Sequence, residues 1–313
     1  MNFFYCYLCF RFPLRLVLYF SKFDSDHAVS VIHMDDKNNN NNNSNIDCTS
    51  TCADYNTEWD VNTYLRTHFS SDYANSVIGK FFPVNVIKIL EQHTQRLQGK
   101  QRVLEFGGGP CLWPSFLLAE YFDEIWFCDY LTSNLQCVRD WLNMEPNAYD
   151  WKAYFDWLLD IKEGHHDNER SYEDRLRFAL NKGNIFQCDI HADNILFLDS
   201  CTSEPQFDMI FSSGCLEAAC STVDIFKQSI DRLGRLLKPG GMFLLLTYRN
   251  SSFYSFNDYK FTDLPINEEL LRKAYEESGL FTDPIFITTD IPIHGTVGDA
   301  DGLMISYAHR KTI

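Results

Sequence analysis

The sequence predicts an α/β fold in which a mostly parallel sheet of seven strands carries helices on both faces. From residue 83 onward, apolar segments of strand length alternate with segments whose apolar residues recur at helical spacing. Such alternation builds parallel strands joined by crossover helices. The last two apolar segments are separated by a loop alone, so we expect the final strand to be antiparallel.

The first half of the pattern ends in a polar stretch that leads to the third strand. Val84, Ile87 and Leu90 lie on one face of the first helix. The two strands are apolar runs, and three glycines end the first of them. The elements expected here are a helix at 83–98, a strand at 101–106, a helix at 112–121, a strand at 124–128, a helix at 131–143 and a short helix at 175–179.

The second half continues the alternation and closes with two consecutive strands. Pro239, Gly240 and Gly241 should break the chain before the fifth strand, and Gly279 should end the last helix. The elements expected are strands at 184–188 and 207–212, a helix at 222–237, a strand at 242–247, a helix at 266–278 and strands at 284–289 and 302–308.

Domain organisation follows from composition along the chain. Of 313 residues, 45% are hydrophobic, which is enough for a large core. The six asparagines Asn38–Asn43 cannot bury apolar surface, so we expect residues 1–56 to be a disordered extension and 57–313 to be the folded domain. Residues 1–22 fit neither a membrane helix nor a secretory signal, because Arg11 and Pro13 interrupt the apolar run. A mitochondrial presequence and an artefactual extension of the gene both remain open.

Charge and cysteine content exclude some functions. The net charge of −16 argues against a broad nucleic-acid surface, which needs clustered Lys and Arg. Eleven cysteines, an odd number, favour free thiols in the reducing cytoplasm over a secreted disulfide framework. Adjacent His165 and His166 point apart on most backbones, so we expect no metal site there and a solvated insertion instead. We also expect no stable membrane insertion.

The strand, the turn Gly107–Gly109 and the following helix form a pattern typical of a nucleotide-type site. Glycines let the backbone approach a ligand, and a helix N-terminus offers free N–H groups. Asp129 follows 22 residues after Gly107, where a carboxylate can accept hydrogen bonds from both ribose hydroxyls. These features alone do not separate NAD from S-adenosylmethionine. Leu112 stands near where a dinucleotide motif needs its third glycine, which disfavours NAD.

Several stretches resemble class I S-adenosylmethionine-dependent methyltransferases, whose Rossmann-like sheet has seven strands with an antiparallel last strand. The glycine turn after Val103-Leu104-Glu105-Phe106 and the later Lys238-Pro239-Gly240-Gly241 carry this likeness. A closer resemblance, spanning about residues 57–311, is to the small-molecule N-methyltransferases acting on nicotinamide, phenylethanolamine and indolethylamine or thioether substrates. It is carried by Trp141–Trp151, Asp129-Tyr130 with Asn134-Leu135, Cys215–Cys220, Ser251–Tyr254, Lys260-Phe261 and Asp60 with Tyr64-Leu65.

The resemblance implies an S-adenosylmethionine site and assigns its residues. Asp129 would hold the ribose, Asp189 would accept from the adenine amino group, and Tyr64 would lie in the N-terminal segment that closes over both ligands. The full set implied for the cofactor is Tyr64, Phe69, Gly107, Gly109, Trp113, Asp129, Asn134, Asp189, Ile190 and Ser213.

The acceptor side departs from the family pattern. Relatives place a carboxylate at the end of the fifth strand, where this chain has Thr247, and a tyrosine where it has His68. Ser251 and Tyr254 match substrate-side positions, and Asp299 stands where the amine-specific branch has an acid. The resemblance therefore implies substrate contacts by His68, Thr247, Ser251, Tyr254 and Asp299, with Tyr64 and Asp299 as the catalytic residues.

Together these patterns imply a monomeric cytoplasmic enzyme that transfers methyl from S-adenosylmethionine to nitrogen of a small amine or pyridine. Methyl transfer is an in-line displacement, so the protein chiefly aligns the reactants and excludes water. Because Thr247 lacks the expected carboxylate, a non-catalytic cofactor-binding protein remains open. An NAD-dependent oxidoreductase is the third alternative.

Overall fold

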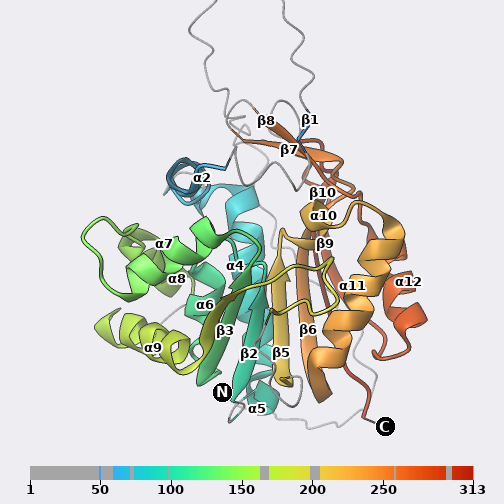
Figure 1. Ribbon diagram of the computed structural model, residues 1–313, viewed down its shortest axis with the longest axis horizontal. Coiled ribbons are helices and arrows are strands. Elements are labelled where there is room, and N and C mark those ends of the chain that lie inside the picture. Colours follow the sequence, from blue (N-terminus) through green and yellow to red (C-terminus); the bar gives the residue numbers. More distant parts are fainter. Residues whose placement is uncertain are drawn as a thin grey trace, which may run out of the picture. The chain divides into compact units, whose positions relative to one another are not determined.

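Seven strands form one continuous sheet in the computed structural model, which describes residues 49–50, 59–70, 74–97, 99, 101–162, 169–197, 205–256, 259–293 and 298–312. The order across the sheet is β4-β3-β2-β5-β6-β10-β9 (Figure 1). The strands are β2 (Arg102–Phe106), β3 (Glu124–Asp129), β4 (Asn184–Gln187), β5 (Phe207–Ser213), β6 (Leu237–Arg249), β9 (Ile285–Thr289) and β10 (Gly302–His309). The seven-stranded sheet predicted from the sequence is confirmed.

Strand directions follow the prediction as well. Each neighbouring pair from β4 to β6 is parallel. The final strand β10 is antiparallel to both β6 and β9. The carboxyl ends of β2 to β6 therefore meet at one end of the sheet, which we call the ligand rim.

Helices cover both faces because the buried strands present apolar side chains in both directions. Val103, Leu244 and Leu246 pack into one core, whereas Leu104, Phe243 and Leu245 pack into the other. The first core is covered by α4 (Val77–Gln92), α6 (Trp113–Leu118), α7 (Thr132–Leu142), α8 (Lys152–Ile161) and α9 (Glu169–Lys182). The second is covered by α11 (Val223–Leu236) and α12 (Glu268–Ser278).

Capping residues set the start of one helix and the end of another. The expected helix at 83–98 begins earlier, at Val77, because Ser76 Oγ accepts from Gly79 N at 2.9 Å and caps the helix. Pro83 then lies inside α4, and His93 separates α4 from the short α5 (Thr94–Leu97). Helix α12 ends at Gly279 as predicted, since this glycine adopts the left-handed φ of 68°.

The predicted break at Pro239–Gly241 is wrong in detail. These residues lie inside β6, where the pairing with β5 shifts between Phe207 and Met209. Gly240 has φ 78° and donates its N–H to Arg310 O at 2.8 Å, so the turn is a bulge within the strand.

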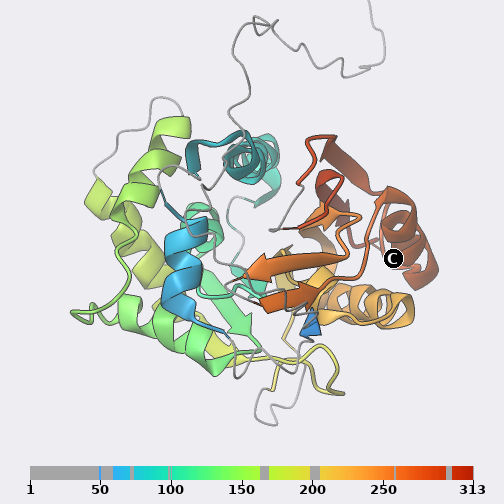
Figure 2. The same ribbon diagram turned by 90° about the horizontal axis from the view of Figure 1, so that it is seen from above.

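Some elements were not predicted. The polar stretch before β4 contains α8, which was not expected, and α9, which extends the short helix predicted at 175–179 to Glu169–Lys182. Near the ligand rim lie α2 (Val61–His68), α10 (Leu216–Ala219) and a small sheet of β1 (Thr49–Ser50), β8 (Tyr259–Thr262) and β7 (Phe253–Phe256). Figure 2, which views the molecule from above, shows α2 and the β7–β8 hairpin over this end of the main sheet.

Contacts group residues 47–313 into one compact unit. Strand β1 pairs in parallel with β8, although its residues fall in the segment expected to precede the domain. Within the described ranges, no helix has the length and apolarity needed to cross a membrane. The asparagine run, His165 and His166 lie outside the described residues.

Candidate active site

The residues predicted to bind a cofactor follow neighbouring strands of the sheet. Asp189 comes after β4, Asp129 ends β3, Gly107 follows β2 and Ser213 ends β5. Because β4, β3, β2 and β5 are adjacent and parallel, these residues line the ligand rim in that order. Such a crevice at the carboxyl ends of strands is where open α/β sheets bind ligands.

The glycine turn is held by close approaches that only glycine permits. Gly107 and Gly108 both donate to Cys128 O, at 3.0 and 3.1 Å. Gly107 and Gly109 have φ values of 67° and 61°, in the left-handed region. A Cβ on Gly107 would lie 2.0 Å from Cys215 Sγ, so the turn is packed directly against the loop after β5.

Asp129 is buried and pre-oriented. Its Oδ2 accepts from Gly109 N at 2.8 Å, and its Oδ1 accepts from Leu131 N and Asn134 Nδ2, both at 2.9 Å. Burial raises the pKa of Asp129, while these hydrogen bonds oppose the rise. The predicted neighbourhood of Asp129 and Asn134 is present, and the carboxylate is fixed beside the glycine turn.

Trp59, which was not predicted as a site residue, connects the N-terminal segment to Asn134 and so to Asp129. Trp59 Nε1 donates to Asn134 Oδ1 at 2.8 Å. The Trp59 ring also lies 4.6 Å from Tyr64 and 5.1 Å from Phe256 of β7, between ring centroids. Trp59 therefore connects three parts of the site: α2, the hairpin and the cofactor side.

The other residues predicted to contact the cofactor pack into the protein around the ligand rim. Phe69 packs on Trp151 at 5.2 Å, and Trp113 packs on Phe211 at 6.1 Å, between ring centroids. Ile190 is buried in the second core. Asp189 Oδ1 accepts from His191 N at 2.8 Å, in a turn after β4.

His68 lies on α2 with its ring 4.8 Å from that of Tyr64. Burial lowers the pKa of His68 to about 4, so its imidazole is neutral at pH 7. A neutral ring adds no positive charge to the acceptor side.

Three of the predicted acceptor-side residues lie in β6, just after it and in β7. Thr247 is fully buried, and its hydroxyl donates to Glu217 Oε1 at 2.8 Å. Ser251 Oγ donates to Asp263 Oδ2 at 2.7 Å. Tyr254 stacks on Phe261, with ring centroids 5.3 Å apart.

Asp299 organises the turn before β7. Its Oδ1 accepts from Ser252 N at 2.8 Å and Phe253 N at 3.3 Å, and its Oδ2 accepts from Ser252 Oγ at 2.5 Å. Partial burial alone would raise the pKa of Asp299, but these bonds together outweigh it and lower the pKa. Both oxygens are thus engaged by the chain itself.

Three acids near the rim were not predicted as site residues. Glu105 in β2 accepts from the Ser115 hydroxyl, and burial raises its pKa to about 8. Glu217 stood in a family-like stretch of the sequence, but Asp263 had no pattern to mark it. Burial raises the pKa of both, that of Asp263 to about 7.

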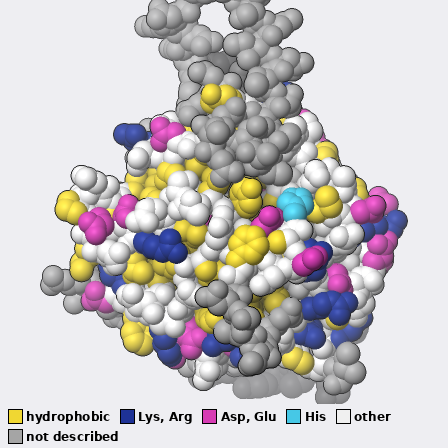
Figure 3. Space-filling view, viewed as in Figure 1, with side chains coloured by type: hydrophobic (Ala, Val, Ile, Leu, Met, Phe, Trp, Pro, Cys, Tyr) yellow, Lys and Arg dark blue, Asp and Glu magenta, His cyan; other side chains and the backbone are white. Residues whose placement is uncertain are grey.

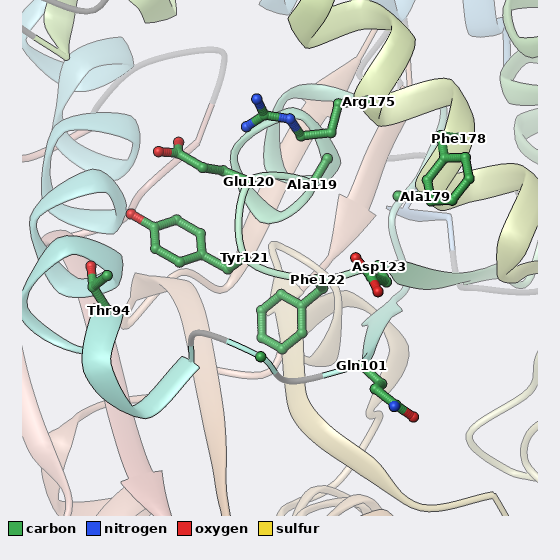
Figure 4. Close-up of a pocket in the computed structure, with 11 residues that line it drawn as sticks. Thr94, Gln101, Ala119, Glu120, Tyr121, Phe122, Asp123, Arg175, Phe178 and Ala179 are labelled. Carbon is green, nitrogen blue, oxygen red and sulfur yellow. The ribbon is translucent and has the colours of Figure 1, made fainter.

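A cavity of about 610 Å³ lies elsewhere. It borders Gln101 and Asp123, which precede β2 and β3, and is therefore at the amino ends of these strands. Figure 4 shows Tyr121 and Phe122 between Thr94 and the residues of α9. None of the predicted site residues lines it.

Comparisons with known proteins agree with the geometry of the rim. The model of the NNMT/PNMT/TEMT family matches residues 47–311. Nicotinamide N-methyltransferase of Homo sapiens is 29% identical over 261 residues, covering 82% of this chain and 94% of that protein. Indolethylamine N-methyltransferase of Mus musculus is 28% identical over 229 residues, covering 72% of this chain and 83% of that protein. Phenylethanolamine N-methyltransferase of Bos taurus is 28% identical over 211 residues, covering 67% and 73%.

A solved structure, that of the CurJ carbon methyltransferase, shares the fold. Its TM-score is 0.50 at 18% identity, over 81% of this chain and 59% of that one. The predicted Rossmann-like methyltransferase sheet is confirmed by this likeness and by the strand order.

Proposed function

The chain belongs to the NNMT/PNMT/TEMT family, and on that premise we propose how its own residues carry out the reaction. The protein is an S-adenosylmethionine-dependent enzyme that methylates nitrogen of a small molecule. The family match leaves the alternatives of a non-catalytic binder and an NAD-dependent oxidoreductase without support.

The residues of the ligand rim suit S-adenosylmethionine in their chemistry. The left-handed glycines keep Cβ atoms out of the turn, and Asp129 is already fixed at the end of β3. We assign the ribose to Asp129, the adenine edge to Asp189 and Ile190, and the methionine part to Gly107, Gly109 and Ser213. When bound, the cofactor supplies a methyl group activated by a positively charged sulfur.

On the acceptor side, the chain's task is to orient a nitrogen and exclude water. Trp59, Tyr64 and Phe256 pack together above the rim, so α2 and the hairpin provide an apolar cover. Glu217, held by Thr247, and Ser251, held by Asp263, supply polar groups beneath this cover. We propose that an amine or pyridine nitrogen lies between these two layers.

We further propose a cytoplasmic monomer. The described cysteines include Cys111, Cys128 and Cys188 as free thiols, which suits a reducing compartment.

The observation that carries the proposal is the buried, pre-oriented Asp129 beside the glycine turn, within a family match covering residues 47–311. Calorimetry with S-adenosylmethionine, followed by a labelled-methyl assay over nicotinamide, quinoline and arylalkylamines, tests it. We expect binding and transfer to at least one acceptor. Cofactor binding without transfer to any of them would contradict the assignment.

A further inference from the structure

Two carboxyl groups on the acceptor side, the buried Glu217 and the half-buried Asp263, each keep one solvent-shielded oxygen without a partner in the described structure. Glu217 is 2% exposed, and its Oε1 accepts from Thr247 Oγ1 at 2.8 Å and Tyr248 N at 3.1 Å. Asp263 Oδ2 accepts from Ser251 Oγ. Glu217 Oε2 and Asp263 Oδ1 are shielded from solvent and have no hydrogen-bond partner among the residues that the structure describes.

These two groups are neighbours. Leu264, next to Asp263, donates its backbone N–H to Glu217 O at 2.8 Å. The negative charge of Glu217 adds to burial in raising the pKa of Asp263, and Asp299 adds a smaller contribution. Acids thus face Asp263 from α10 and from the loop before β10.

Such an arrangement is costly for a protein without a ligand. A buried, unpaired carboxyl oxygen costs free energy, and two like charges close together disfavour each other. A ligand that brings several N–H donors and a positive charge satisfies both oxygens and removes the repulsion. Asp299 does not carry this cost, because the turn at Ser252 and Phe253 already gives both of its oxygens hydrogen-bond donors.

Glu217 and Asp263 lie near both the glycine turn and the aromatic rings that cover the acceptor side. Glu217 follows Cys215, whose Sγ occupies the space that a Cβ on Gly107 would fill. Asp263 follows Phe261, which stacks on Tyr254 and lies 6.5 Å from the Trp59 ring, between centroids. Glu217 thus lies two residues from the contact with the glycine turn, and Asp263 lies two residues from the aromatic cluster.

We propose that Asp263, paired with Glu217, is the specificity-determining group that binds the acceptor through a basic amine and selects it over a neutral pyridine. This deepens and rests on the proposed function. The acid pair supplies, from α10 and the hairpin, the negative charge that Thr247 does not supply at the end of β6.

The test compares Asp263→Asn with Asp283→Asn, the same substitution at an exposed acid. The probes are tryptamine and 2-phenylethylamine, which are cationic at pH 7, and nicotinamide and quinoline, which are neutral. In Asp263→Asn we expect KM for the two amines to rise at least tenfold, with KM for nicotinamide and quinoline changed less than twofold. Asp283→Asn should change neither.

Acceptor binding to the full chain saturated with S-adenosylhomocysteine, measured by calorimetry, gives a readout that does not depend on turnover. We expect the wild type to bind the amines more tightly than the neutral probes and Asp263→Asn to lose this preference. Asp263→Asn should also melt a few degrees higher at pH 8 without acceptor, since it removes a desolvated charge. Asp263→Ser, a second variant that removes the charge, should lose the same preference for amines.

The outcomes separate this proposal from the function on which it rests. Failure of the wild type to bind S-adenosylmethionine would refute the cofactor assignment and this proposal with it. Binding of the cofactor with no amine preference, or an equal loss of both acceptor classes in Asp263→Asn, would overturn the acid pair alone. Loss confined to the amines supports it.

Discussion

Glu105 is a carboxyl group that the fold keeps protonated. It is buried in β2 next to the glycine turn, with Oε2 accepting from Ser115 and Oε1 unpaired within the described part of the chain. Its pKa rises from 4.5 to about 8, because burial disfavours the charged form. At pH 7 the folded protein therefore holds a proton here that the unfolded chain has lost.

This difference gives stability a pH dependence of definite sign. Between about pH 4.5 and 8, this group should lower the free energy of unfolding as pH rises, by up to about 1.4 kcal/mol per unit. Glu105→Gln removes the titration, so its stability relative to wild type should increase across that window and level off above it. Urea unfolding at pH 5.5, 7 and 8.5 measures the difference, and parallel pH profiles for the two proteins would refute it.

Gly107 and Gly279 form a matched pair for testing the glycine turn. Their φ values are 67° and 68°, but a Cβ on Gly107 meets Cys215 Sγ at 2.0 Å while one on Gly279 meets nothing within 4 Å. Gly279→Ala should cost about 1 kcal/mol from backbone strain alone. Gly107→Ala adds overpacking and should cost roughly 2–4 kcal/mol.

Chemical denaturation and calorimetry with S-adenosylmethionine check this pair. Only Gly107→Ala should also abolish cofactor binding, since it displaces the turn. Equal costs for the two variants would show that Cys215 yields without strain.

At the residue scale, the sequence placed Asp129 and Asn134 side by side, and the structure joins them by a hydrogen bond. Asp129 was predicted because it ends the strand that follows the glycine turn, and Asn134 because the family resemblance places it beside that carboxylate. Asp263 was missed because its importance comes from Glu217, which is distant in sequence. Whether Asp299 had free oxygens depended likewise on the fold of Ser252 and Phe253.

At the element scale, the connection between α2 and the cofactor side depends on one indole. Trp59→Phe keeps an aromatic ring against Tyr64 and Phe256 but leaves Asn134 Oδ1 without its donor. An unsatisfied buried acceptor costs about 1–3 kcal/mol. We therefore expect S-adenosylmethionine to bind roughly tenfold more weakly.

Trp126→Phe is the control for this prediction. The indole nitrogen of Trp126 is buried without a hydrogen-bond partner in the described structure, so its loss removes no bond. Cofactor affinity measured by calorimetry should change less than twofold in this variant. A comparable loss in both would assign the effect to ring packing.

Elements with a strong hydrophobic pattern were predicted well, and those defined by tertiary contacts were not. The seven strands are apolar runs that two layers of helices must cover, so their pattern is unambiguous. Strands β7 and β8 are short and half-exposed, and each is stabilised by pairing with a partner rather than by its own composition. The bulge in β6 likewise depends on Arg310, which is far away in the sequence.

At the scale of the whole molecule, the boundary of the domain can be tested by truncation. The family match and the compact unit both begin at residue 47, whereas the sequence predicts a domain from residue 57. A chain starting at 47 should bind S-adenosylmethionine within twofold of the full chain. A chain starting at 57 loses β1 and its pairing with β8, so KM for the acceptor should rise about three- to tenfold.

Steady-state kinetics of the two truncated chains decide between the boundaries. Equal KM values would place the boundary at 57 or later. Loss of cofactor binding in the longer chain would show that earlier residues contribute to the rim.

The net charge of −16 has little to do with the site. Figure 3 shows acidic and basic side chains interspersed over the described surface of one face. The acids with assigned roles are buried or half-buried at the rim, and only the fold distinguishes them from the solvated majority.

Trp59 contacts both the acceptor side and the cofactor side of the site. One side of its ring contacts the hairpin over the acceptor, while its nitrogen reaches the residue that holds Asp129. Because one indole contacts both sides, we expect opening of this contact to release the spent cofactor and the methylated product together.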